Sequence, residues 1–176
     1  MKMTQRLIAL VSAILIGAAA LTSCSAPDVD TPDGMQLASL DGVEYALYVP
    51  ESWTVNKNSG VSGAYVSAYD KSNVSLVSYV PTAAITMEQY WTMCEESYKA
   101  EFENYALLEN GTTTMAGATA PYYVYSATVS GVEYKFLQAI VANNGMFYLF
   151  TYTAEPANYD THIESVMEMI EVFTFR

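Results

Sequence analysis

The second half of the sequence restricts the fold most, because three strand-like runs follow one another there with very short connections. The runs are residues 122–129, 132–142 and 146–154, and they are rich in tyrosine, phenylalanine and valine, which favour strands. Their connections contain Gly131 and Gly145. Short turns with glycine join strands that lie side by side, so these runs are predicted to pair antiparallel.

The last of these runs is apolar on both of its faces. Alternation along a strand places Tyr148 and Phe150 on one side and Phe147 and Leu149 on the other. A strand with two apolar faces has to be covered on both sides, which indicates a central strand between two further layers.

Two segments have the apolar spacing of amphipathic helices. The first spans residues 86–102, and Thr86 and Gln89 at its start have the spacing of a capping box. Its apolar positions are Met87, Tyr90, Trp91, Cys94, Tyr98 and Phe102, and those of the second helix are Tyr159, Ile163, Val166, Met167 and Ile170. Each helix can therefore cover one face of the predicted sheet.

Further strand-like runs complete the predicted sheet. They are residues 43–49, a hairpin formed by residues 64–69 and 74–79, a short run at residues 105–109, and the closing residues 172–175. The predicted fold class is α+β, with a central antiparallel sheet of about six or seven strands and two main helices.

The N-terminus resembles a bacterial lipoprotein signal sequence. Lys2 and Arg6 precede residues 7–21, an uncharged apolar run shorter than the roughly 20 residues that span a bilayer. The following Leu21-Thr22-Ser23-Cys24 resembles the lipobox, in which the cysteine thiol receives the lipid. The resemblance implies a signal peptide at residues 1–23, cleaved before Cys24, and a diacylglycerol anchor on Cys24. A single-pass membrane anchor is the alternative.

Residues 24–41 are predicted to be the lipidated cysteine followed by a flexible acidic tether, and residues 42–176 to be one domain. The tether contains Pro27, Pro32 and Gly34 and has no apolar period. With Cys24 bound to lipid, Cys94 has no second cysteine, so no disulfide is predicted; its helical apolar neighbours indicate a buried residue.

Charge and motif content exclude several classes of function. There are 19 acidic side chains against 7 basic ones, a formal net charge of -12, which argues against nucleic acid as a partner. The single histidine, His162, is interpreted as a solvated or half-buried helix residue. No nucleophile elbow, phosphate-binding loop or paired-cysteine metal motif is present, so no catalytic residue, metal site or cofactor is predicted.

The order of elements resembles the PsbP-like, or Mog1/PsbP, domains, a family that includes small bacterial lipoproteins. Tyr48-Val49-Pro50-Glu51-Ser52-Trp53 resembles the family's first strand and turn, and residues 86–102 resemble its internal helix. Residues 147–154, with the terminal helix and the tail at residues 173–175, are similar to the end of the domain. The resemblance implies an α/β/α sandwich around the antiparallel sheet and an accessory or docking role.

The 15 tyrosines allow two interpretations. Their rings can pack in the core, or they can form an exposed aromatic face for a protein or a sugar. Those in or beside the predicted strands are Tyr65, Tyr69, Tyr79, Tyr122, Tyr123, Tyr125, Tyr134, Tyr148 and Tyr152.

These features predict a lipoprotein held at the cell membrane by the lipid on Cys24 and facing outside the cytoplasm. Its predicted role is a non-enzymatic binding or accessory module for an envelope protein or ligand, with binding residues unknown. Two alternatives stay open: a lipoprotein that holds a small ligand between sheet and helix, and a carboxylate-dependent hydrolase.

Overall fold

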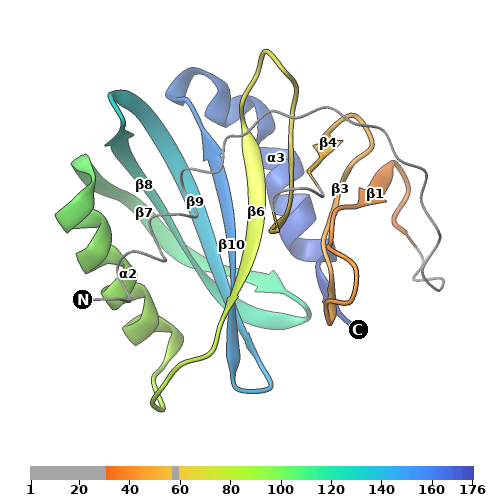
Figure 1. Ribbon diagram of the computed structural model, residues 1–176, viewed down its shortest axis with the longest axis horizontal. Helices are drawn as coiled ribbons and strands as arrows, with labels where there is room; N and C mark the ends of the chain where they lie inside the picture. The colour runs from red at the N-terminus through yellow and green to blue at the C-terminus, as the bar shows by residue number, and fades with distance from the viewer. Residues whose placement is uncertain (1–30, 57–59) are drawn as a thin grey trace.

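The computed structural model describes residues 31–56 and 60–176 (Figure 1). The predicted signal peptide and Cys24 lie outside these residues. The described chain forms a sheet with a helix on each side, which confirms the predicted α+β sandwich (Figure 1).

The central sheet formed by the described residues has seven strands, and each neighbouring pair is antiparallel. In spatial order its strands are β4 (Thr54–Val55), β5 (Ser62–Tyr65), β6 (Asn73–Tyr79), β10 (Met146–Ala154), β9 (Val132–Asn143), β8 (Ala118–Val129) and β7 (Glu103–Met115). The predicted hairpin is confirmed as β5 and β6, but its first strand, expected at residues 64–69, ends at Tyr65, so residues 66–69 belong to the loop. The three long runs are confirmed as β8, β9 and β10.

Three two-residue turns connect β7, β8, β9 and β10. They are formed by Ala116-Gly117, Ser130-Gly131 and Asn144-Gly145, and both residues of each turn have positive φ. This is the type I′ geometry, whose twist matches that of the strands it joins. The first turn was not apparent from the sequence, because alanine rarely adopts a positive φ.

Strand β7 is much longer than the short run expected at residues 105–109. Its pairing with β8 shifts register twice, between Glu103 and Ala106 and between Leu107 and Glu109. Each shift moves the following side chains to the opposite face of the sheet, so the apolar alternation that marks a strand is lost. Most of this strand could therefore not be predicted from the sequence pattern.

Strand β10 occupies the middle of the sheet, as its two apolar faces predicted. It pairs with β6 on one side and with β9 on the other. Helix α2 (Met87–Glu101) covers one face of the sheet and helix α3 (Pro156–Val172) the opposite face (Figure 1). At the start of α2, Thr86 Oγ1 accepts a hydrogen bond from Gln89 N–H, and the Gln89 side chain accepts one from Thr86 N–H, so the predicted capping box is present.

The N-terminal part of the described chain corrects the predicted tether, which does not extend to Asp41. Strand β1 (Met35–Leu37) pairs with β3 (Tyr48–Pro50), and Ala38 is buried. Ser39 Oγ accepts a 2.7 Å hydrogen bond from Leu47 N–H. These contacts join residues on either side of a turn in the chain, so no periodic pattern in the sequence predicts them. The domain therefore includes residues 35–41.

The strand expected at residues 43–49 is divided into two. Strand β2 (Tyr45–Ala46) pairs with β11 (Thr174–Phe175) at the C-terminus, whereas β3 pairs with β1. Strands β1 and β11, near the two ends of the domain, thus each belong to a small two-stranded sheet separate from the main one.

Replacing Ala116 by glycine is expected to stabilise the protein by about 1 kcal/mol, because glycine adopts the φ of +53° at this position without steric strain. Urea unfolding of the variant measures the effect. The matched control, Ala118→Gly, lies two residues later in β8 and is expected to destabilise, since glycine weakens a strand. Loss of stability in both variants would contradict this account of the turn.

Candidate functional site

Cys94 is a packing residue and not a reactive group. Its side chain is on α2 and faces the sheet, with 1% of the residue exposed. Burial raises the pKa of the Cys94 thiol to about 11, so the thiolate is scarce at neutral pH. The prediction of a small buried residue is confirmed.

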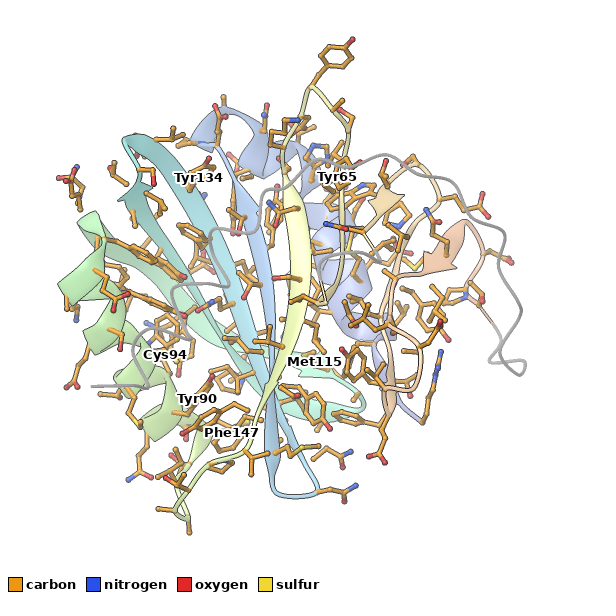
Figure 2. The ribbon with its side chains drawn as sticks, in the orientation of Figure 1. Tyr65, Tyr90, Cys94, Met115, Tyr134 and Phe147 are labelled. Atoms are coloured by element: carbon orange, nitrogen blue, oxygen red, sulfur yellow. The ribbon has the colours of Figure 1, made fainter. Side chains whose placement is uncertain are left out.

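Most tyrosine rings pack inside the protein. Between α2 and the sheet, the Trp91 and Tyr123 rings stack with centroids 3.9 Å apart. Tyr125 stacks between Tyr98 and Phe136, at 5.3 and 4.8 Å. Figure 2 shows side chains filling the space between the helix and the strands around Tyr90 and Cys94. These contacts support the packing interpretation, and they occupy the space in which a ligand between sheet and helix would have to bind.

Polar groups are brought together at the end of the sheet where the β5–β6 loop meets the first turns of α3. His162 Nε2 lies 2.7 Å from Asp70 Oδ2, and Asn158 Nδ2 donates to Asp70 Oδ1 at 3.3 Å. Asp70 Oδ1 also accepts from Ser72 N–H at 2.9 Å. The Asp70 carboxylate therefore joins the loop to the helix.

The electrostatic environment of Asp70 favours its ionised form. Burial opposes the charge, but hydrogen bonds from Ser72 and His162 outweigh burial, and the pKa of Asp70 lies below its ordinary value. Asn158 is in the first turn of α3, where the helix dipole also favours a negative charge. The Trp53 ring also packs against His162, with centroids 5.7 Å apart and the two rings nearly perpendicular.

The β5–β6 loop is closed by several hydrogen bonds of its own. Ser67 Oγ accepts from Tyr69 N–H at 3.2 Å and from Asp70 N–H at 3.0 Å. At the base of the loop, Val66 N–H donates to Ser72 C=O at 2.8 Å. The result is a loop braced by hydrogen bonds that carries Tyr69, a residue that is 99% exposed.

This arrangement suits recognition better than catalysis. A serine, a histidine and an aspartate do come together, but Ser72 is only 2% exposed and cannot meet a substrate. Among residues 31–56 and 60–176, no three histidine, cysteine, aspartate or glutamate side chains are grouped so as to hold a metal ion. A rigid loop with one exposed aromatic ring, in contrast, can bind a partner with little loss of conformational entropy.

A shallow depression lies at the other end of the sheet, beside the β9–β10 turn. Its walls include residues 81–85, Ala142 and Phe147, and none of the residues that line it is ionisable. It therefore offers no group for acid–base chemistry.

None of the helices formed by the described residues is long and apolar enough to span a bilayer.

Sequence reasoning placed His162 correctly as a half-buried helix residue but did not find its partner. Asp70 is 92 positions away in the chain. The local signal was the pair Ser67 and Asp70, whose spacing is typical of a side-chain-stabilised turn. That spacing predicts a turn but says nothing about which helix packs against it.

Comparison with known proteins defines the class of fold. No protein-family model matches the chain, and no curated protein sequence matches it. Solved structures do match, and they include proteins of the PsbP and Mog1 type, so the fold is PsbP/Mog1-like.

Three solved structures illustrate the likeness. Cyanobacterial PsbP (CyanoP) from Synechocystis has a TM-score of 0.57 and 16% identity, covering 89% of this chain and 99% of its own. LpqN, involved in cell envelope biogenesis of Mycobacterium tuberculosis, has a TM-score of 0.56 and 13% identity, covering 80% and 90%. The Ran-binding protein Mog1p of Saccharomyces cerevisiae has a TM-score of 0.55 and 10% identity, covering 80% and 95%.

Replacing Asp70 by alanine is expected to destabilise the protein by about 1 to 3 kcal/mol at neutral pH, because three donors lose their acceptor. The pKa of Asp70 is lowered on folding, so its ionised form stabilises the fold above the ordinary carboxyl pKa of about 3.9. This stabilisation is lost as the pH falls through the folded-state pKa. Urea unfolding at pH 7 and pH 3 should therefore show a difference from the wild type that shrinks at pH 3.

Asp160→Ala is the matched control. The Asp160 side chain is 86% exposed, and its carboxylate lies 3.5 Å from Lys135 Nζ. Its removal should change stability by less than about 0.5 kcal/mol at either pH. Equal effects of the two substitutions would show that Asp70 does not hold the loop to α3.

Proposed function

We propose that the protein is a lipoprotein, anchored outside the cytoplasm through Cys24, that acts as a non-enzymatic binding module for an envelope protein. Tyr69 and the loop that carries it form the docking point. The observation that carries this proposal is a fully exposed tyrosine on a loop that is held by the hydrogen bonds of Ser67 and by the contact of Asp70 with His162.

The anchor is supported by the sequence and by one structural neighbour. The basic start, the short apolar run and the lipobox-like ending at Cys24 have the order that lipid modification requires. LpqN, which shares the fold, takes part in cell envelope biogenesis. Two or more acyl chains would hold the protein durably, since each buried methylene contributes about 0.8 kcal/mol.

A binding role is supported by the neighbours as well as by the geometry. Mog1p is a Ran-binding protein, and LpqN takes part in envelope biogenesis. Exposed tyrosine is well suited to such a role, because its ring buries a large apolar area on binding and its hydroxyl can hydrogen-bond. The inaccessible Ser72 and the depression without ionisable walls favour a binding module over a hydrolase.

Replacing Cys24 by alanine should yield an uncleaved precursor without lipid, because the acceptor thiol is gone. Metabolic labelling with a fatty acid that carries a clickable group measures this directly. Cys94→Ala is the matched control and should keep the label, since Cys94 is buried. Normal labelling of the Cys24 variant would refute the anchor.

Replacing Tyr69 by alanine should weaken partner capture at least tenfold, about 1.4 kcal/mol or more, as expected for an aromatic anchor. In-cell crosslinking of the tagged lipoprotein, with identification of the captured protein, measures the loss. Stability should change by less than about 0.5 kcal/mol, because Tyr69 is exposed.

The control for this experiment is Val80→Ala, which also truncates an exposed apolar side chain. It should leave the captured protein and its yield unchanged. Undiminished capture by the Tyr69 variant would show that docking does not use this loop.

A further inference from the structure

Strand β7 forms one edge of the seven-stranded sheet, at the opposite end of the strand order from the β4–β5–β6 side that carries Tyr69. In the part of the chain that the structure describes, only β8 pairs with it. Such an edge presents unpaired backbone N–H and C=O groups and can accept another strand.

The turn between β7 and β8 shows which backbone groups point outward. A two-residue turn closes on a hydrogen-bonded pair, here Met115 and Ala118, and such pairs alternate with non-hydrogen-bonded ones along antiparallel strands. The backbone groups of Asn110, Thr112 and Thr114 therefore point away from β8. The location of Pro121 opposite Thr112 agrees with this, because a proline has no N–H to donate.

The two halves of β7 differ in how well they are protected against pairing. The first half contains both register shifts, and bulges of this kind disrupt an edge. From Glu109 to Met115 the pairing is continuous, and after Glu109 there is no charged residue and no proline. The regular half of the edge therefore lacks the bulges, charged side chains and prolines that normally prevent the addition of another strand.

The surroundings of this edge indicate the chemistry of its partner. Strand β7 carries Glu103 and Glu109 and no lysine or arginine. Leu107 and Leu108, 40% and 53% exposed, lie just before the regular half and offer apolar contact. An incoming strand with basic and apolar side chains would match both features. A second copy of the chain would not, since each copy has a net charge of -12.

We infer that the edge formed by residues 109–115 of β7 binds an extended, basic segment of a partner protein as an eighth strand of the sheet. Backbone hydrogen bonds to Asn110, Thr112 and Thr114 hold the segment, and Glu103 and Glu109 select for its charge. This inference rests on the proposed binding function and adds a second contact surface to it.

The test uses the full-length lipoprotein in detergent micelles and a ten-residue peptide of alternating lysine and valine as the probe. Titration measures affinity, and amide hydrogen exchange with mass spectrometry locates the site. The expected result is exchange protection of residues 109–115 and at least tenfold weaker binding of the matched glutamate–valine peptide. Absence of binding by the lysine peptide at about 1 mM, or protection elsewhere only, would overturn the inference.

Two substitutions at Thr112 probe the edge itself. Thr112→Pro removes an outward N–H without removing a bond to β8, and Thr112→Lys leaves the backbone intact but repels a basic segment. Each substitution should weaken binding of the lysine–valine peptide at least tenfold, whereas the control Thr112→Val should leave the affinity unchanged. Because a lysine on this exposed position keeps the fold, Thr112→Lys decides the question if the proline variant unfolds. Unchanged affinity in Thr112→Lys would overturn the inference.

Tyr69→Ala separates this inference from the proposed function. It should leave peptide binding at β7 unchanged, because the two surfaces lie on different sides of the sheet. If the Thr112 variants bind the peptide normally while Tyr69→Ala loses its captured partner in cells, the edge-strand inference fails and the proposed function stands. If residues 109–115 are instead protected without peptide, to an extent that depends on protein concentration, then the edge pairs with a second copy of the chain and the inference of a basic partner is overturned.

Discussion

The rest of the structure depends on the burial of strand β10 on both of its faces. Phe147 and Leu149 face α2, whereas Tyr148, Phe150 and Tyr152 belong to the cluster on the α3 side. Neither set can be left in water without losing the free energy of apolar burial, so a layer is required on each side of the sheet. The place of β10 between β6 and β9, and the positions of the two helices, follow from this requirement.

Coverage of both faces has a consequence for function. The aromatic layer under α2 is closely stacked, as the 3.9 Å separation of Trp91 and Tyr123 shows, so the faces of the sheet are packing surfaces. What remains available to a partner is the loops and the edges of the sheet. The loop that carries Tyr69 and the outer edge of β7 are two such places, and both are rigid because neighbouring hydrogen bonds or strand pairing hold them.

The sequence predicted elements well where the determining interactions are local. The capping box of Thr86 and Gln89 spans three residues, and glycine at 131 and 145 specifies tight turns by its own backbone freedom. Prediction was wrong where periodicity was interrupted or absent. The register shifts around Leu107 concealed β7, and β1 was assigned to a tether because three residues are too few to show a period. The candidate site could mostly not be predicted, since the spacing of Ser67 and Asp70 indicates only a turn, and neither the exposure of Tyr69 nor the contact of Asp70 with His162 has a sequence pattern.

The sequence by itself determined the two helices, the three long strands β8 to β10 and the need for a layer on each face of the sheet, because apolar period, capping and turn chemistry act between residues close in the chain. It also carries the anchor prediction at Cys24, which depends on consecutive residues alone. Only the tertiary structure decided that Asp70 meets His162 across 92 positions and that β7 is an edge strand of the sheet that the described residues form. Contacts of this kind form when separate elements pack together. Packing interactions throughout the core, and no local sequence pattern, determine which elements meet.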